Sequence, residues 1–429
     1  MKRGVLSLLA ALVVVASHGT VHAQQDCCRL IASEVALRYR VAALAERRFT
    51  HRQLWDALAP FLGRGGVRAT EIGRSVQGRA LRAISFGTGP TRVLLWSQMH
   101  GDESTATMAL ADIVRFLAEG GDAPLRRVIR ERLTVVMIPM LNPDGAERFQ
   151  RRNAVGVDIN RDARRLATPE ARALKALRDS LRPDFGFNLH DQGARNTVGE
   201  NGLPVAIALL APAADSARSF GPVRDRARQL AALLIAAAGD VIAGRVAKYD
   251  DTFNPRAFGD LIQQWGTSTI LIESGALPDD PQKQHLRGIN VMLVLTALEA
   301  IATERYTAVD IERYETVPFN RGVPSDVLLS GGQVVVPNGE PLRLDIALRY
   351  EDPVARRGLV VEEIGDLTGA QGMDTVDVRG LFLHVETTTT QDPDDWWLLP
   401  DQEITVTVRR GPGVESEMVA RLPEPKQGS

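Results

Sequence analysis

The sequence VLLWSQMHGDESTATMALADIVRFL, residues 93–117, begins with an apolar run of strand length from Val93 to Trp96. From Thr105 to Leu117 the apolar residues recur with the 3.6-residue spacing of a helix. Further apolar runs of strand length, with helical patterns between them, occur at Leu133–Met140, Phe185–Leu189 and Thr269–Ile272. Strands that alternate with helices predict an α/β fold, in which helices sandwich a mixed, largely parallel sheet.

The flanking regions have different patterns. Residues 24–66 carry apolar positions at helical spacing, interrupted where Thr50 and Gln53 have the spacing of a capping box. After about Tyr306 the helical patterns give way to short strand-like segments. We therefore predict four parts of the chain: a signal peptide at 1–23, an N-terminal helical segment at 24–66, a central α/β domain at 67–302 and a small β-rich accessory domain at 303–429.

The first 23 residues have the pattern of a secretory signal peptide. Lys2 and Arg3 precede an apolar run from Val5 to Ala16, and the segment ends with the small-x-small tripeptide Val21-His22-Ala23. The apolar run is short for a membrane crossing. We expect cleavage after Ala23 and a secreted or periplasmic protein without stable membrane insertion; an uncleaved anchor is the alternative.

The composition is that of an ordinary globular protein. Of 429 residues, 44% are hydrophobic and 24% are charged, and the formal net charge is −2. This near-neutral balance predicts no nucleic-acid partner. The adjacent Cys27 and Cys28 would form a strained disulfide, and the sequence indicates neither their pairing nor an oligomeric state.

Two histidines stand at the ends of predicted strands. His100 follows the run Val93–Trp96, and Glu103 lies three residues later, where the next helix begins, so both side chains can reach one cation. His190 directly follows the run Phe185–Leu189 and should emerge at the carboxyl edge of the same sheet, where α/β folds bind ligands. Two histidines and one glutamate would hold zinc and leave a position for water. A His-x-x-Glu pair by itself often arises by chance, so its meaning depends on the rest of the chain.

Six short motifs follow one another in the order of a known family. They are IGRSVQGR (72–79), His100 with Glu103, NPDG (142–145), RRNAVGVDINRD (151–162), NLH (188–190) and LIESG (271–275). Together they make the region from Ile72 to Gly275 resemble the zinc carboxypeptidase family, typified by pancreatic carboxypeptidase A. The resemblance implies a zinc metallocarboxypeptidase acting on peptides, with one zinc ion per chain held by His100, Glu103 and His190.

The resemblance also implies roles for other residues. Glu273 would be the general base that takes a proton from water and passes it to the leaving amine. Asp158 would accept the other ring N–H of His100 and fix its tautomer. Arg151, or Arg152 beside it, would stabilise the oxyanion through its guanidinium group.

Three further residues would contact the substrate. Asn160 and Arg161 match the pair that binds the C-terminal carboxylate in the family. Tyr249 is the candidate for a tyrosine that closes over the substrate, although it stands slightly far upstream of Glu273 for the family spacing. Asp191-Gln192 and the segment 256–261 depart from the pancreatic pattern, and the sequence therefore does not indicate which side chain is preferred.

Two alternatives remain beside the carboxypeptidase. One is an amidase or peptidase that acts on cell-wall muropeptides, and the other is an inactive carboxypeptidase-like binding protein. Retention of all three ligands and of Glu273 argues against the inactive protein. The accessory domain has no catalytic pattern, and its acidic-aromatic loop, Asp392–Trp397, is interpreted as a packing loop rather than a contact for a glycan or a partner.

Overall fold

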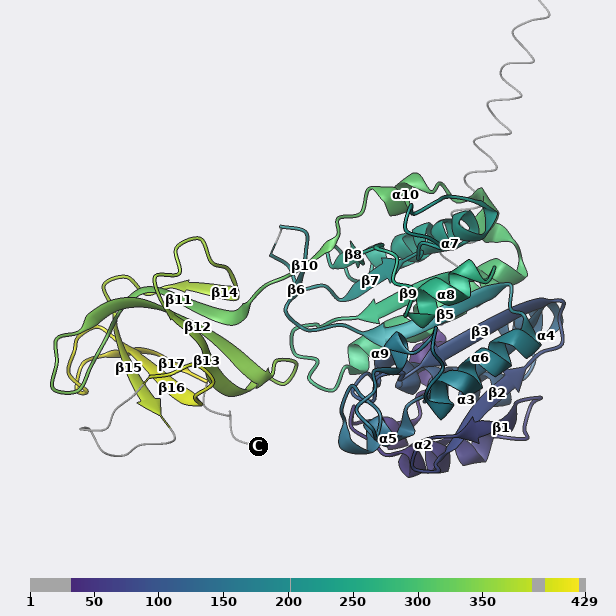
Figure 1. Cartoon of the computed structure of the whole chain (residues 1–429), viewed down its shortest axis with the longest axis horizontal. Coiled ribbons are helices and arrows are strands. Elements are labelled where there is room, and N and C mark those ends of the chain that lie inside the picture. Colours follow the sequence, from purple (N-terminus) through teal and green to yellow (C-terminus); the bar gives the residue numbers. More distant parts are fainter. Residues whose placement is uncertain (1–31, 201, 388–397, 424–429) are drawn as a thin grey trace, which may run out of the picture. The chain divides into compact units, whose positions relative to one another are not determined.

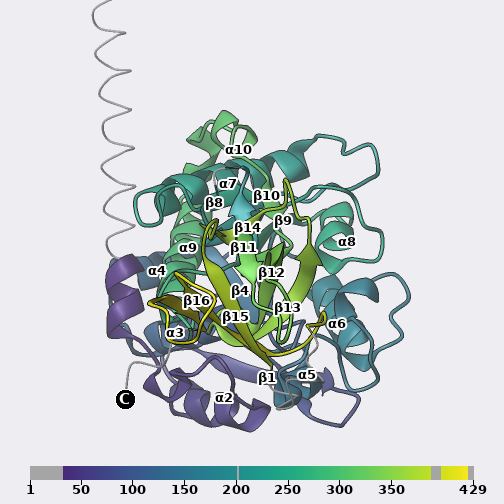
Figure 2. The same cartoon turned by 90° about the vertical axis from the view of Figure 1, so that its left-hand side faces the viewer.

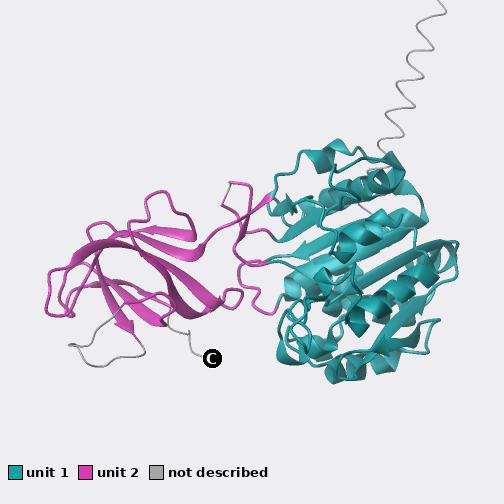
Figure 3. Ribbon diagram, in the orientation of Figure 1, with its two compact units in different colours: residues 1–192, 206–275, 283–319 teal, residues 193–205, 276–282, 320–429 magenta. Residues whose placement is uncertain are grey.

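The computed structural model describes residues 32–200, 202–387 and 398–423. The expected signal peptide, Cys27, Cys28 and the Asp392–Trp397 loop lie outside these residues. The chain divides into two compact units (Figure 3). Unit 1 comprises residues 1–192, 206–275 and 283–319, and unit 2 comprises residues 193–205, 276–282 and 320–429.

Unit 1 is built on an eight-stranded sheet with the strand order β1-β2-β4-β3-β5-β9-β7-β8 (Figure 1). The four middle strands β4, β3, β5 and β9 run parallel, whereas β2 pairs antiparallel with β4 and β7 pairs antiparallel with β9. The predicted mixed, largely parallel sheet is confirmed. Its strands are β1 (Arg68–Arg74), β2 (Ala80–Phe86), β3 (Thr91–Ser97), β4 (Leu133–Ile138), β5 (Phe185–Asp191), β7 (Ile207–Leu210), β8 (Val246–Lys248) and β9 (Ser268–Ser274).

Helices cover both faces of this sheet, as Figure 2 shows. One face packs against α6 and α8 through a buried cluster that includes Leu94 and Trp96 of β3, Leu174 of α6 and Phe258 of α8. Because both faces are covered, β5 and β9 are buried along almost their whole length, which explains why their middle residues are mostly apolar rather than alternating with polar ones. The principal helices are α3 (Thr105–Glu119), α4 (Pro124–Arg132), α6 (Pro169–Leu181), α7 (Pro222–Gly239), α8 (Phe258–Gln264) and α9 (Gln284–Ala302).

The short elements of unit 1 lie before β1, in the loops, and after α9. At the N-terminus of α2, Thr50 and Gln53 form the predicted capping box, in which each side chain accepts a hydrogen bond from the other residue's backbone N–H. Residues 303–319, which the sequence analysis assigned to the accessory domain, belong to unit 1, where the Tyr314 hydroxyl accepts a hydrogen bond from the backbone N–H of Ala211. These elements are η1 (Ala42–Leu44), α2 (His51–Leu58), η2 (Ala59–Phe61), α5 (Pro143–Arg148), η3 (Ile159–Arg161), η4 (Arg305–Ala308) and α10 (Glu312–Glu315).

Helix α9 is the one described helix that is long and apolar enough to cross a membrane by length and composition. In the protein, 89% of its apolar window is buried. It packs beside α3, and its Arg287 makes a fully buried ion pair with Asp112 of α3. The helix is therefore a core element of unit 1, and its apolar character follows from that burial.

Unit 2 contains a seven-stranded sheet around its own buried apolar core. Its order is β13-β12-β11-β15-β16-β17, and β14 pairs in parallel with β11. A separate two-stranded ribbon joins β10 to β6, which lies in the loop after β5. The predicted C-terminal β-rich domain is thus present. Its strands are β6 (Asn196–Val198), β10 (Asn320–Gly322), β11 (Ser325–Val334), β12 (Leu342–Asp352), β13 (Arg357–Gly365), β14 (Gly372–Asp377), β15 (Phe382–Thr387), β16 (Ile404–Arg409) and β17 (Met418–Leu422).

Candidate active site

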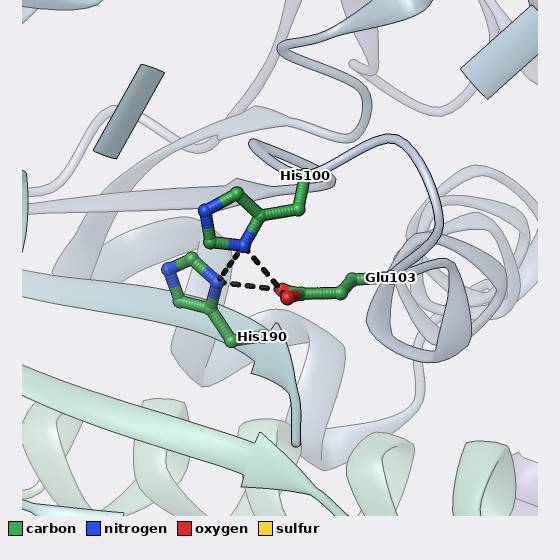
Figure 4. Close-up of side chains that lie close together, drawn as sticks. All are labelled: His100, Glu103 and His190. Atoms are coloured by element: carbon green, nitrogen blue, oxygen red, sulfur yellow. Dashed lines mark hydrogen bonds and ion pairs between the residues drawn. The ribbon is translucent and has the colours of Figure 1, made fainter. Parts of the chain in front are cut away.

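The three residues predicted as metal ligands lie together at the carboxyl edge of the parallel strands (Figure 4). His100 follows β3, Glu103 stands just before α3, and His190 lies within β5, which continues two residues beyond the predicted apolar run. The Nδ1 atoms of both histidines lie 2.7 Å from carboxylate oxygens of Glu103, and 3.2 Å from each other. Among the described residues, this is the one group of three such side chains whose ligand atoms come within 4.8 Å of one another.

The donor atoms of this cluster fit a divalent metal. All three residues are at most 8% exposed, so the Glu103 carboxylate and the two imidazole rings have little access to water. Two imidazole nitrogens at 3.2 Å cannot both carry protons that point at each other, and a cation between them and the carboxylate satisfies all three groups. Two histidines with one carboxylate are a donor set that suits zinc.

Electrostatics within the metal-free cluster follow from the same contacts. Burial alone would lower the pKa of His100, but the carboxylates of Glu103 and Asp158 raise it to about 9. Burial would raise the pKa of Glu103, yet the two histidines hold it well below its usual value. For His190, burial prevails and lowers the pKa. The cluster therefore contains an ionised carboxylate that already attracts positive charge.

Asp158 lies on the far side of His100 from this cluster. Its Oδ1 is 3.1 Å from His100 Nε2, so the ring donates there and leaves Nδ1 free to face the metal position. Burial would raise the pKa of Asp158, but hydrogen bonds and charge from His100 and Arg151 keep it well below its usual value. The geometry is that expected of a residue that orients a histidine ligand.

Two glycines bring the His100 loop against the loop that carries Arg151. A Cβ atom on Gly101 would lie 2.1 Å from the backbone carbon of Gly145, so the two backbones touch where no side chain fits. The carbonyl of Arg151 then accepts hydrogen bonds from the Gly101 N–H and from the Asn142 side chain. The motifs HGDE and NPDG are thus parts of one packed arrangement, which fixes the position of the Arg151 backbone.

The two arginines that the sequence left as alternatives, Arg151 and Arg152, have different surroundings in the structure. The Arg151 guanidinium donates two hydrogen bonds to Asp158, at 2.9 and 3.1 Å, and lies 3.3 Å from Glu103. Its side chain remains 43% exposed, so it can also meet a substrate. Arg152 instead donates to the carbonyl of Gly156 on the exposed side of the loop. Arg151 is therefore the arginine that lies at the cluster.

The candidate base Glu273 lies on β9 directly opposite His190 of β5. It is 7% exposed, and burial, followed by the charge of Glu103, raises its pKa well above the usual value. A carboxylate with a raised pKa next to a metal position is suited to taking and returning a proton near neutral pH.

Tyr249 lies close to this carboxylate despite its spacing in the sequence. The charge of Glu273, followed by burial, raises the pKa of the Tyr249 phenol to about 12. Its backbone N–H donates to the carbonyl of Leu209 in β7, so the residue is held beside the sheet. The structure therefore brings Tyr249 to the site.

The predicted carboxylate-binding pair follows Asp158 in η3. Asn160 uses its Oδ1 to accept the backbone N–H of Phe258, which anchors the start of α8. Arg161 donates to the carbonyl of Asn160 and is exposed. Glu273 and burial raise the pKa of Tyr249, and burial raises the pKa of Asp260; the charge of Arg161 partly opposes both increases, so this guanidinium lies near both groups. Arg161 is thus an exposed cation at the same edge of the site.

Sequence reasoning missed a buried polar group beneath the site. Asp191, next to His190, accepts hydrogen bonds from Thr105 and from Lys283, and its backbone N–H donates to Glu103 Oε2 at 3.1 Å. Lys283 is 92 residues away in the chain, and its own surroundings carry no motif. The departure from the pancreatic pattern at Asp191 was the one available signal.

A buried His-Glu-His cluster that could hold a metal ion therefore lies beside a strand-borne glutamate, at the carboxyl edge of a sheet that is covered by helices on both faces. The zinc carboxypeptidase family, Peptidase_M14, matches residues 65–195 of this chain. The matched range includes the three ligand positions and all the predicted arginines, and it ends before Glu273.

Two curated relatives illustrate the similarity. An uncharacterized protein from Zymomonas mobilis is 27% identical over 158 residues, which cover 35% of this chain and 41% of that protein. The probable carboxypeptidase 2 of Arthroderma benhamiae is 30% identical over 108 residues, which cover 25% of this chain and 20% of that protein. The chain thus spans less than half the length of either relative.

Solved structures of carboxypeptidases are also similar. A metallo-carboxypeptidase from Burkholderia cenocepacia aligns with a TM-score of 0.47 and 21% identity, covering 59% of this chain and 70% of that one. Bovine thrombin-activatable fibrinolysis inhibitor, solved with a tick carboxypeptidase inhibitor, aligns with a TM-score of 0.49 and 12% identity, covering 60% of this chain and 98% of that one.

Proposed function

We propose that this protein is a zinc-dependent carboxypeptidase that removes C-terminal residues from peptides. The observation that carries the proposal is the pairing of β5 with β9, which sets the metal-ligand candidate His190 opposite the buried carboxylate of Glu273. Metal-dependent peptide hydrolysis requires a metal position and a proton acceptor side by side. The family match of residues 65–195 supports the same chemistry.

In this proposal His100, Glu103 and His190 would hold one zinc ion. The metal would supply a Lewis acid for the scissile carbonyl and for the attacking water. Glu273 accepts the proton of the attacking water and donates it to the leaving amine, a role for which its raised pKa is suited. Arg151, beside the cluster and partly exposed, stabilises the negative charge that develops on the carbonyl oxygen.

The exopeptidase preference rests on the cationic side of the site. Arg161 is an exposed guanidinium close enough to Tyr249 to influence its pKa, and it would bind the substrate's terminal carboxylate together with the amide nitrogen of Asn160. Tyr249 would contact the bound substrate near Glu273. We also propose that the protein acts after export, because residues 1–23 have a signal-peptide pattern.

The decisive experiment uses the zinc-loaded protein and a mixed peptide library with free C-termini. We expect release of single C-terminal amino acids, and we expect Glu273→Gln to retain zinc while kcat falls by at least about 10²-fold. Glu131→Gln, which alters an exposed carboxylate on α4, is the matched control and should behave as wild type.

Amidated copies of the same peptides test the exopeptidase assignment separately. If Arg161 reads a terminal carboxylate, amidation should slow cleavage strongly, and Arg161→Met should reduce the difference between the two libraries. Rapid cleavage of the amidated library would refute the exopeptidase assignment. Unchanged turnover by Glu273→Gln would refute the role of the base.

A further inference from the structure

One lysine links the strand ends that carry His190 and Glu273. Lys283 donates from Nζ to Asp191 Oδ2 at 3.0 Å and to the backbone carbonyl of Ser274 at 3.3 Å. Asp191 directly follows His190, and Ser274 directly follows Glu273. The two acceptor residues also face each other in the β5–β9 register. A single ammonium group therefore bridges Asp191 and Ser274, the last residue pair of the β5–β9 ladder, which directly follows the pair His190 and Glu273.

The carboxylate in this ion pair extends the link to Glu103 and α3. Asp191 Oδ2 also accepts the hydroxyl of Thr105, the first residue of α3, at 2.7 Å. The Asp191 backbone N–H donates to Glu103 Oε2 at 3.1 Å. Through Asp191 and Lys283, therefore, the start of α3 and the ends of β5 and β9 are joined to one another.

The pair is placed at a cost to local stability. The side chains of Lys283 and Asp191 are 5% and 8% exposed, so both charges lack water. Lys283 has φ 53° and ψ 31°, a left-handed backbone conformation that residues other than glycine and asparagine seldom adopt. Buried ion pairs seldom add net stability over apolar residues of the same size. A strained backbone that carries a buried charge is more readily explained by a positional requirement.

We propose that Lys283 and Asp191 are positioning residues, which fix the spacing between the metal ligand His190 and the base Glu273. This inference rests on the proposed function for the meaning of that spacing. Neither residue touches the reacting atoms; they act through the backbone positions that immediately follow the two functional side chains. If the link is lost, the β5 and β9 ends and the Glu103 carboxylate lose their common anchor, although the sheet itself remains paired.

The test compares two buried ion pairs of unit 1. Lys283→Met removes the link and leaves Asp191 without its cation. Arg305→Met does the same to Glu299, whose ion pair with Arg305 is 2.5 Å long, with side chains 10% and 7% exposed. The three measurements are the melting temperature, the zinc affinity by competition with a chromogenic chelator, and kcat and KM on the cleaved peptides.

We expect both variants to lose melting temperature, because each leaves a buried carboxylate unpaired. Only Lys283→Met should weaken zinc binding, by roughly 10–100-fold, as happens when groups that orient metal ligands are removed. Its kcat should fall by about 10²-fold with little change in KM, since a small displacement of the base suffices for such a loss. The double variant Asp191→Asn with Lys283→Met removes the unpaired charge; it should regain melting temperature but keep the weak zinc binding and low kcat.

The outcomes separate this inference from the proposed function. Wild-type zinc affinity and kcat in Lys283→Met, or equal losses in Arg305→Met, would overturn the positioning role. Recovery of both zinc affinity and kcat in the double variant would overturn it as well, and that variant also serves if Lys283→Met fails to fold. If the wild-type protein binds zinc but releases no amino acids, the proposed function fails, while the zinc affinities still decide the role of Lys283.

Discussion

Replacing Asp260 by asparagine should stabilise unit 1 at neutral and alkaline pH. Asp260 lies in the first turn of α8, and burial raises its pKa from 3.8 to about 6. Its Oδ1 accepts the backbone N–H of Asn254 at 3.0 Å, and an asparagine oxygen can accept the same bond. The substitution therefore removes a poorly solvated charge and keeps the contact.

The magnitude follows from the shift in pKa. A folded-state pKa above the unfolded value means that ionisation opposes folding. The cost is absent well below pH 4, grows between about pH 4 and 6, and is complete above about pH 6. With about 1.4 kcal/mol for each unit of pKa, the full cost is up to about 3 kcal/mol, which corresponds to a rise in melting temperature of roughly 5 °C or more.

The assay is thermal unfolding of the zinc-free protein between pH 4 and pH 8, so that zinc binding does not add its own stabilisation. Asp122→Asn, at an exposed aspartate between α3 and α4, is the control and should change little at any pH. A difference between Asp260→Asn and wild type that stays the same across the pH range would refute the reasoning, as would a loss of stability at pH 8.

Three further predictions concern the site. Arg151→Lys should lower kcat by about 10²-fold or more in peptide hydrolysis, because the forked donor is lost, while Arg152→Lys should remain near wild type. Gly101→Ala should destabilise unit 1 by about 3 kcal/mol in denaturant unfolding, since its Cβ would meet backbone at 2.1 Å, whereas Gly239→Ala, with open space around it, should not destabilise the protein. Chelation should abolish activity and zinc should restore it. Although burial lowers the pKa of His100, nearby carboxylates raise it to about 9, so calorimetry should show proton release on zinc binding and weaker affinity as the pH falls below 9.

The central strands and the metal cluster could be predicted because their signals are local. The apolar runs that became β3, β5 and β9 reflect burial on both faces of the sheet, and each ends within four residues of His100, His190 or Glu273. The capping box at Thr50 was equally readable, since its partners lie three residues apart. The sequence predicted that His190 directly follows its strand. In the structure His190 pairs with Glu273 of β9 and is therefore part of β5.

The remaining features depend on contacts between distant residues. The difference between Arg151 and Arg152 is decided by how the backbones of Gly101 and Gly145 meet, some 45 residues apart in the sequence. The proximity of Tyr249 to Glu273 depends on the path of β8 beside β7 rather than on spacing in the chain. The inclusion of residues 193–205 and 276–282 in unit 2 similarly has no periodic signal, because irregular loops gain their partners only in the folded chain.

The three-part composition of unit 2 means that no single cut in the polypeptide releases it. A truncation after residue 319 would remove β10 to β17 but leave behind the loops 193–205 and 276–282, which begin three residues after His190 and Glu273. Apolar side chains on those loops, such as Leu203 and Leu277, would be left without the rest of their unit. Transfer of this β-rich unit between related proteins would therefore require three segments to be exchanged together, and two of the splice points would lie directly after β5 and β9.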